Sequence, residues 1–282
     1  MFLHIAYLGP PGTYTHQAAR RFLREFPANT CELQPYPGIP GILYAVDQGN
    51  ATLGVVPVEN SIEGSVSVTH DILAHELSLT IQGETVLPIT HHLYTKASAP
   101  EEIHTVFGHY QALAQCRHYL EQKVGQAEIR NTSSSAEAVS LLKSADTGLA
   151  AIGTLECREL YDIPALAEDI GDYHDNQTRF FLIGKKPALL SSEGARIKTS
   201  LVLALRKDEP GGLYQVLGEF ARRRLNLTRI ESRPAKQELG NYLFFLDCEA
   251  SPEDPVFQSA LINLAKKSAL LKILGTYPVI NA

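Results

Sequence analysis

Polar side chains that can bind anions or carry protons gather where an expected strand ends and a helix or turn begins. Residues 9–15 read Gly-Pro-Pro-Gly-Thr-Tyr-Thr after the first apolar run, and free amides at a helix start attract an anion such as a carboxylate. This segment lacks the Gly-Lys-Ser/Thr ending of a nucleotide-binding loop. Residues 57–66, Pro-Val-Glu-Asn-Ser-Ile-Glu-Gly-Ser-Val, place two carboxylates, an amide and two hydroxyls after a buried strand. Ligands of open α/β sheets bind outside the carboxyl ends of the strands, so these groups predict a cleft.

Three further segments repeat this arrangement. Residues 109–116 begin with a histidine and carry Gln111 and Gln115 on one helix face. Residues 131–136 place several hydroxyls at a helix start, and residues 175–181 place a threonine beside an arginine, whose planar guanidinium suits a carboxylate ligand. Each segment alone is explained as well by a capped helix start or an exposed loop. Together the five segments indicate a single cleft.

The elements that would position these groups alternate between short apolar runs and helical stretches, which indicates α/β layering. Strands are expected at residues 4–8, 53–57, 78–87, 91–94, 105–108, 128–131 and 149–153, with a further strand-like run at 180–183. Helices are expected at residues 16–26, 39–48, 68–74, 112–122 and 136–144.

The last eighty or so residues form a separate pattern. Strands are expected at 199–206, 226–233, 241–248 and 273–279, and amphipathic helices at 211–224 and 255–271. Their order is βαββαβ, the ferredoxin-like arrangement.

Composition places the chain among ordinary globular proteins. Its 282 residues suffice for two domains, and 44% hydrophobic with 20% charged residues excludes global disorder. Residues 1–195 carry 12 Lys and Arg against 22 Asp and Glu, and residues 196–282 carry 13 against 9. This shift favours a boundary near residue 195, and neither part has the basic stripe of a nucleic-acid binder.

The apolar stretches, the first eight residues and the cysteines together predict the cellular location. No apolar stretch approaches a membrane span, and residues 1–8 read as a buried strand rather than a secretion signal. The four cysteines are scattered singly, which argues against a zinc site or disulfide framework. We therefore expect a cytoplasmic protein with reduced thiols, without a nucleic-acid or membrane partner.

Taken together, these motifs resemble those of prephenate dehydratases, enzymes of phenylalanine biosynthesis. Gly-Pro-x-Gly-Thr-Tyr at 9–14, Val-Pro-Val-Glu-Asn-Ser-Ile-Glu-Gly-Ser-Val at 56–66, Gln-Ala-Leu-Ala-Gln-Cys at 111–116 and Asn-x-Thr-Arg-Phe at 176–180 resemble the family's signatures in the same order. The C-terminal unit resembles an ACT regulatory domain, with Asn-Leu-Thr-Arg-Ile-Glu-Ser-Arg-Pro at 226–234 matching a phenylalanine-site signature. The resemblance covers essentially the whole chain.

The resemblance implies an α/β fold with a two-lobed, periplasmic-binding-protein-like catalytic region and a ferredoxin-like βαββαβ ACT domain. The catalytic region would span 1–185, with lobe 1 at about 1–80 and 165–185 and lobe 2 at about 81–164. A linker at 186–196 and the ACT domain at 197–282 would follow. The active site would lie between the lobes, which agrees with the placement of the polar turns.

The implied activity is conversion of prephenate to phenylpyruvate by loss of carbon dioxide and hydroxide, with no cofactor and no metal. Thr178 would donate to the departing hydroxyl, although a threonine is a weak acid and the ultimate proton source stays open. The implied catalytic residues are Thr178, Asn60, Gln115 and Glu59. The implied substrate-binding residues are Thr13, Ser61, Arg179 and Phe180.

The resemblance also implies allosteric inhibition by L-phenylalanine in a homodimer or homotetramer built through ACT domains. The implied effector-binding residues are Gly211, Gly212, Leu213, Asn226, Leu227, Glu231 and Ser232. We expect a chain truncated after residue 190 to keep catalysis and lose inhibition. Arogenate dehydratase activity and a non-catalytic amino-acid or ligand sensor are the alternatives.

The chain departs from the family's pattern at two places. The family usually has Ser or Asn before the motif histidine and Pro after it, where this chain has Gly108 and Tyr110. The other effector-site signature is usually Gly-Ala-Leu, and here it is Gly-Gly-Leu at 211–213. Because glycine preserves close backbone approach, we expect effector binding to survive with altered affinity.

Overall fold

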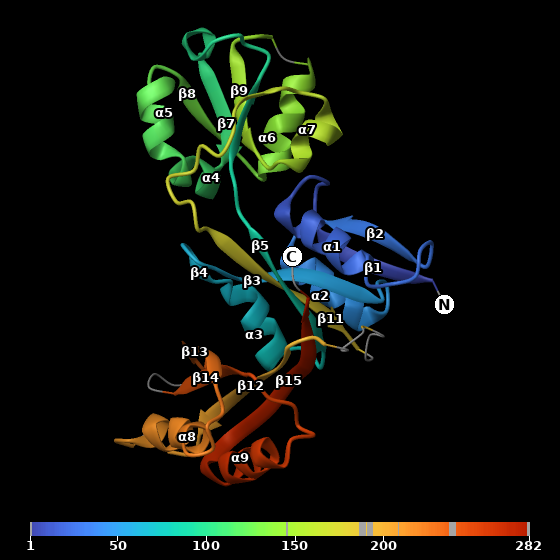
Figure 1. Ribbon diagram of the computed structural model, residues 1–282, viewed down its shortest axis with the longest axis vertical. Helices are drawn as coiled ribbons and strands as arrows, with labels where there is room; N and C mark the ends of the chain where they lie inside the picture. Colours follow the sequence, from blue (N-terminus) through green and yellow to red (C-terminus); the bar gives the residue numbers. More distant parts are fainter. Residues whose placement is uncertain are drawn as a thin grey trace.

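The computed structural model describes residues 2–144, 146–185, 190, 194–207, 209–236 and 241–280. Three parts follow one another along the longest axis of the molecule (Figure 1): a lobe of green and yellow segments, a central lobe holding the N-terminal strands, and an orange and red C-terminal unit. Most of the expected linker, at residues 186–189 and 191–193, lies outside the described residues. None of the helices in the described part of the chain has the length and apolar character that a membrane span requires.

The central lobe is built on five strands of a larger sheet, and helices cover both faces of these strands. Strand β1 pairs in parallel with β2 and β3, whereas β11 runs antiparallel between β3 and β5. The strands are β1 (Leu3–Leu8), β2 (Cys31–Tyr36), β3 (Leu53–Asn60), β5 (Thr80–Pro88) and β11 (Gln177–Gly184), with the short β4 (Gly64–Ser65) paired to β3. The helices are α1 (Tyr14–Leu23), α2 (Ile39–Gln48) and α3 (Ser67–His75).

The second lobe has its own five-stranded sheet, in the order β10-β6-β9-β7-β8. Its strands are β6 (His92–Thr95), β7 (Thr105–His109), β8 (Glu128–Thr132), β9 (Leu149–Gly153) and β10 (Ala165–Ala167). Its helices are α4 (Tyr110–Gln115), α5 (Arg117–Lys123), α6 (Ser135–Leu141) and α7 (Glu156–Tyr161), with 3-10 turns η1 (Pro100–Glu102) and η2 (Leu142–Ser144).

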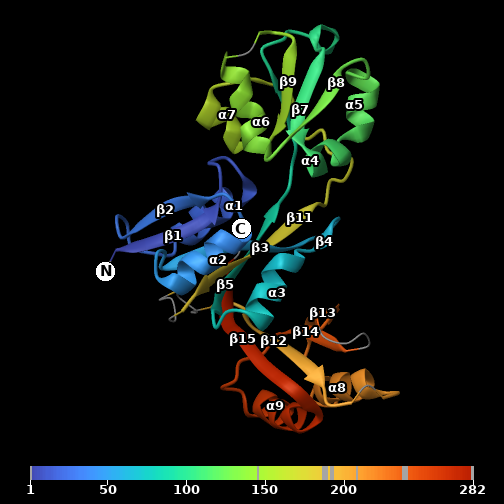
Figure 2. The ribbon, with the colours of Figure 1, turned by 180° about the vertical axis from the view of Figure 1, so that it is seen from behind.

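The C-terminal unit has the predicted βαββαβ order and its helices lie on one face of its strands, as Figure 2 shows from behind. Its elements are β12 (Ile197–Leu205), α8 (Gly212–Ala221), β13 (Leu227–Pro234), β14 (Tyr242–Cys248), α9 (Pro255–Lys267) and β15 (Ser268–Ile280). The end of β15 pairs in parallel with β5, Val279 opposite Glu84. One sheet therefore runs from the C-terminal unit through the central lobe, in the order β13-β14-β12-β15-β5-β11-β3-β1-β2.

The α/β class, the two lobes and the ferredoxin-like unit are confirmed, but the predicted lobe limits are wrong. Strand β5 stays in the central sheet as far as Pro88, where it pairs with β11. Strand β10 pairs with β6 in the second lobe, so the return comes after Ala167. The chain therefore crosses between the lobes at residues 89–91 and 168–176, and not at 80–81 and 164–165.

Candidate functional site

The Thr178 hydroxyl lies against the Asn60 amide, because β11 and β3 pair these two residues directly. Asn60 Nδ2 donates to Thr178 Oγ1 and to Asn176 Oδ1, both at 2.8 Å. Asn60 Oδ1 accepts the backbone N–H groups of Ile62 and Glu63, both at 3.0 Å. Since a backbone N–H can only donate, these two bonds orient the amide so that its NH₂ group points at Thr178.

The network continues into the second lobe through the Gln115 amide. Asn176 Nδ2 donates to Gln115 Oε1 at 2.9 Å, and Gln115 Nε2 donates to Glu63 Oε1 at 3.3 Å. Ser61 Oγ accepts the backbone N–H of Gln177 at 2.9 Å. Asn176 and Gln115 are both buried, so the bond between them is shielded from water, and it joins the two lobes where the chain crosses between them.

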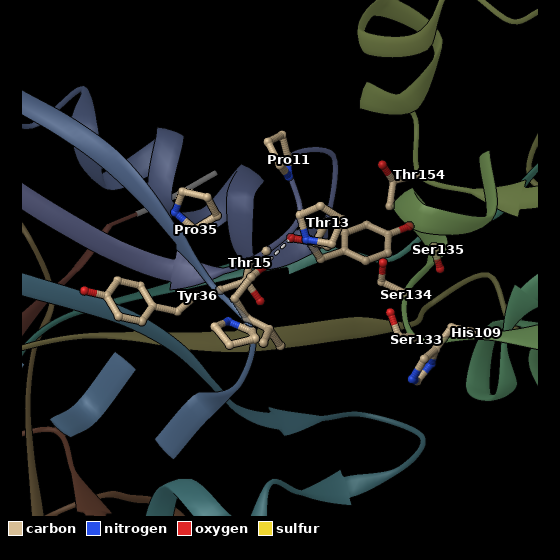
Figure 3. Close-up of a pocket in the computed structure, with 15 residues that line it drawn as sticks. Pro11, Thr13, Thr15, Pro35, Tyr36, His109, Ser133, Ser134, Ser135 and Thr154 are labelled. Atoms are coloured by element: carbon tan, nitrogen blue, oxygen red, sulfur yellow. Dashed lines mark hydrogen bonds between the residues drawn. The ribbon is translucent and has the colours of Figure 1, made fainter. Parts of the chain in front are cut away.

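A cavity of about 560 Å³ opens between the lobes (Figure 3). Residues 11, 13–15 and 35–36 line one side of it, and residues 109 and 133–135 line the other. Thr13 caps α1 by accepting the N–H of His16 at 3.2 Å, which leaves other first-turn amides of α1 free. The described lining residues include no Lys or Arg. A carboxylate held here would therefore be bound by N–H and O–H groups.

Thr178 is not among the lining residues, but two aromatic residues connect its network to the cavity. The Tyr14 ring stands edge-on to the ring of His91, 6.4 Å between centroids, and the Tyr14 hydroxyl donates to the carbonyl of Thr90. His109 lines the cavity, where burial lowers its pKa and the nearby Glu63 carboxylate partly offsets that effect. The cavity and the network are therefore linked by Tyr14, whose ring contacts His91, which in turn is bonded to Gln115.

The two family departures beside His109 have local structural consequences. A Cβ atom at Gly108 would lie 2.9 Å from Leu113 Cγ, so a larger residue there requires Leu113 to move. The Tyr110 ring is exposed and lies beside the His109 ring, 4.5 Å between centroids.

Arg179 does not reach the cleft, which corrects its expected role as a carboxylate ligand. Successive residues of a strand point to opposite faces, and Arg179 points away from Thr178 into a buried cluster. Its guanidinium lies 2.6 Å from Asp247, 3.2 Å from Glu84 and 3.0 Å from Glu59. Burial alone lowers the pKa of Arg179, but the Asp247 and Glu84 carboxylates reverse this and raise it.

Glu59 and Phe180 are likewise placed away from the Thr178 hydroxyl. Glu59 contacts Arg179 and, at 3.7 Å, Arg229 of the C-terminal unit. Phe180 is 1% exposed and packs in the apolar core of the central lobe. Phe180 is therefore packed in the core and the Glu59 carboxylate is engaged by two arginines, and their catalytic and substrate-binding roles stay predictions.

The expected effector residues occupy both ends of α8 and the middle of β13. Gly211 begins the helix with φ +88°, and a Cβ at Gly212 would lie 2.8 Å from Leu205 Cδ1. Asn226 and Leu227 follow the other end of α8, where Asn226 Nδ2 donates to Glu249 at 2.6 Å. A ten-residue helix, about 15 Å long, separates the two groups. A single chain does not bring them together.

Glu231 and Ser232 lie on opposite faces of β13. Glu231 faces the central lobe between Arg229 and Arg233 and is bonded to both; its role in effector binding stays a prediction. Ser232 is on the exposed face.

Several residues that the structure places at the site were not among the predicted site residues. They are Glu63, His91, His109, Asn176, the serines 133–135, Tyr14, Thr15 and Thr154. Most of them lie inside or beside the polar turns that predicted the cleft. His91 was included only as part of a strand, because a lone histidine carries no pattern.

Comparison with known proteins gives matches over almost the whole chain. The family model for prephenate dehydratase matches residues 5–188, and the ACT domain model matches residues 199–265. A prephenate dehydratase of Methanocaldococcus jannaschii is 42% identical over 280 residues, 98% of each chain.

Two solved structures are similar along the same length. The prephenate dehydratase of Arthrobacter aurescens in complex with L-Phe has a TM-score of 0.85 and 36% identity, over 98% of this chain and 90% of that one. GqqA, described as a novel type of quorum quenching acylase, has a TM-score of 0.83 and 28% identity over 98% of both chains. The family matches, the predicted motifs and the polar network between two lobes agree, and this chain belongs to the prephenate dehydratase family, with a C-terminal ACT domain.

Proposed function

We propose that this chain converts prephenate to phenylpyruvate and is inhibited by L-phenylalanine bound to its ACT domain. The observation that carries the catalytic part is the Asn60 amide, oriented by two backbone N–H groups so that it donates to Thr178 Oγ1 at 2.8 Å. The neighbouring cavity of about 560 Å³ has the size of a small-molecule site.

The reaction requires the protein to bind the substrate and to place one hydrogen-bond donor at the departing hydroxyl. The bond between the ring carbon and its carboxylate breaks, and carbon dioxide leaves. The electron pair moves through the ring and expels the hydroxyl on the opposite carbon, which takes up a proton and departs as water. Aromatisation supplies the driving force, and no hydride or electron sink is involved.

Thr178 is well arranged to serve the departing hydroxyl. Because its oxygen accepts a hydrogen bond from Asn60, its own hydrogen is free to be donated. The Asn60 N–H also stabilises negative charge that develops on Thr178 Oγ1 as its proton is shared. The amides and hydroxyls at residues 13–15 and 133–135 would hold the substrate carboxylates.

Incubation of the purified chain with prephenate, followed by the absorbance of phenylpyruvate, tests this function. Arogenate in a parallel reaction distinguishes the closest alternative, because the same elimination on arogenate yields phenylalanine. Saturable binding of prephenate without product would favour the sensor alternative. We expect phenylpyruvate from prephenate.

Inhibition by phenylalanine requires that the ACT domain affects the cleft, and contacts across β13 supply a route. Arg229 bonds Ser65 and His70 at 3.0 and 2.8 Å, and lies 3.7 Å from Glu59, the neighbour of Asn60. Arg233 bonds Asp71 of α3 at 3.1 Å. A shift of β13 therefore acts directly on the segment that orients Asn60.

The effector site would form between two copies of the chain, because one copy separates Gly211–Leu213 from Asn226 by the length of α8. Edge strand β13 can be covered by such pairing. We expect a homodimer or a tetramer of dimers, measured by light scattering at micromolar concentration. Asn226→Ala should weaken inhibition and leave uninhibited turnover unchanged. A monomer that is still inhibited would contradict this arrangement.

A further inference from the structure

His91 is buried where the chain crosses from the central lobe to the second lobe, and the function proposed above gives it no role. The residue is 5% exposed. Its carbonyl accepts the N–H of Ile170, on the returning segment, at 2.8 Å, and its ring meets the edge of Tyr14, which lines the cavity. The imidazole therefore lies between the crossing segments and the cavity.

A chain of three side-chain amides links Thr178 to His91, and backbone N–H groups at one end determine which atom donates and which accepts in each of its hydrogen bonds. Two backbone N–H groups make the Asn60 side-chain oxygen an acceptor, so its NH₂ group faces Asn176 Oδ1. The Asn176 NH₂ group must then face Gln115 Oε1. The carbonyl oxygen of Gln115 is thus an acceptor at the end of the chain of amides.

His91 Nε2 lies 3.0 Å from the same Gln115 oxygen. Because that oxygen can only accept, Nε2 must carry a hydrogen. Burial lowers the pKa of His91, although its bond to Gln115 partly offsets this, and a lowered pKa favours the neutral ring, which has one N–H. Nδ1 is then the unprotonated nitrogen, in agreement with its burial without a hydrogen-bond partner among the described residues.

We propose that His91 is a positioning residue for the dehydration: its Nε2–H, together with the Glu63 carboxylate, holds Gln115 in the orientation that accepts from Asn176, and so secures the far end of the amide network whose near end, Asn60, donates to Thr178. The role rests on the proposed function. If the oxygen and nitrogen of the Gln115 side-chain amide exchanged places, the NH₂ group of Gln115 would face both the Asn176 NH₂ group and the His91 N–H. His91 supplies one of the two donors that oppose this flip.

Three substitutions separate positioning from packing. His91→Gln places an amide N–H near the position of Nε2, His91→Asn places one nearer Nδ1, and His91→Phe fills the space with no donor. We expect His91→Gln to keep kcat within about threefold of the wild type. We expect the other two to lower kcat about tenfold to hundredfold with KM little changed.

His92→Gln is the matched control, because His92 bonds Thr90 and the N–H of Asp169 outside the chain of amides. It should retain wild-type kcat. Equal activity of His91→Gln and His91→Asn, or wild-type kcat in His91→Phe, would overturn the proposal.

A spectroscopic measurement on the unmutated full chain tests the proposal without turnover. Two-bond ¹H–¹⁵N correlation of histidine-labelled protein should show a neutral Nε2–H ring whose signals disappear in His91→Gln and persist in His92→Gln. A neutral Nδ1–H ring for His91 would contradict the assignment. Failure of the wild type to act on prephenate would instead contradict the proposed function and leave this hydrogen-bond result standing.

Discussion

Thr178 is a weak acid in water, and what it can do depends on the group that donates to it. In this chain, that group is the Asn60 amide, whose orientation comes from the turn that follows β3. The turn after β3 thus does more than reverse the chain, because the backbone N–H groups of Ile62 and Glu63 select which end of the Asn60 amide faces the hydroxyl.

Asn60→Asp keeps the shape of the side chain and removes its donor. Carboxylate oxygens would still accept the N–H groups of Ile62 and Glu63, but Thr178 would have to donate to Asp rather than to a leaving group. We expect kcat to fall about a hundredfold or more at neutral pH, the scale seen when one aimed donor is lost. Activity should recover partly toward acid pH, since a protonated carboxyl can donate again. Unchanged kcat at neutral pH would contradict this account.

The position of Arg179 could not be read from the sequence motif alone. Thr178 and Arg179 are adjacent in the motif, which suggested a shared site, yet alternation along a strand places them on opposite faces. That signal was present in the sequence, because residues 180–183 already read as a strand. The carboxylates that surround Arg179 come from β3, β5 and β14, and such long-range partners cannot be predicted from the local sequence pattern.

Arg179→Met should therefore lower stability. It would leave the buried Asp247 carboxylate without its ion-pair partner and Glu84 with Lys198 alone, at a cost of about 3–5 kcal/mol in the free energy of unfolding, measurable by urea denaturation. Arg130→Met is the matched control, because Arg130 pairs with Glu128 on the surface and should change stability by about 1 kcal/mol or less. Equal effects of the two substitutions would show that the buried cluster is not stabilising.

Helices α8 and α9 are joined by one carboxylate. Glu219 of α8 accepts from Asn263 and Lys267 of α9 at 3.1 and 2.5 Å, and from Arg222 and Arg223 of its own helix region at 2.7 Å. The Lys267 hydrogen bond is the largest of the effects that set the pKa of Glu219 at about 2.

This lowered pKa predicts acid sensitivity of the ACT helices. The folded-state pKa lies below the unfolded value near 4.5, so the stabilisation is fully present above that unfolded value and is lost as the pH falls through about 2. Glu219→Gln should lower Tm at neutral pH and reduce the loss of Tm on acidification to pH 3. Glu128→Gln, on the surface, should change neither. An unaltered pH dependence in Glu219→Gln would contradict the prediction.

Elements with strong apolar periodicity were predicted well, and those that depend on tertiary contacts were not. Strand β2 was missed because it contains Pro35 and alternates polar residues, and it exists because β1 pairs along its whole length. The predicted helix 112–122 is interrupted at Cys116, where φ is −117° and ψ is 16°. The predicted helix 255–271 ends at Lys267, since residues 268–271 pair with β12.

At the scale of the whole molecule, the central lobe and the C-terminal unit are held together by one sheet and one buried charge cluster. Strand β15 extends the central sheet beside β5. Lys198 of β12 lies 2.6 Å from Glu84 of β5, and Asp247 of β14 lies 2.6 Å from Arg179 of β11. The C-terminal unit therefore helps to hold β11, the strand that carries Thr178, in place.

This arrangement reverses the expectation for a truncated chain. Removing everything after residue 190 would expose the edge of β5 and leave Glu84 and Arg179 without Lys198 and Asp247. We expect a protein with a broadened, low-temperature unfolding transition and reduced turnover, measured by calorimetry and by phenylpyruvate formation. A truncated chain with wild-type Tm and kcat would show that the units are independent.

The central claim is that the Thr178 hydroxyl, freed by Asn60, serves the departing hydroxyl of prephenate. The most direct measurement compares phenylpyruvate formation from saturating prephenate by the wild type, Thr178→Ser and Thr178→Ala, with matched Tm values as evidence of intact folding. The wild type should form phenylpyruvate, Thr178→Ser should retain most of kcat, and Thr178→Ala should lose about a hundredfold or more. Wild-type turnover by a well-folded Thr178→Ala protein would contradict the claim.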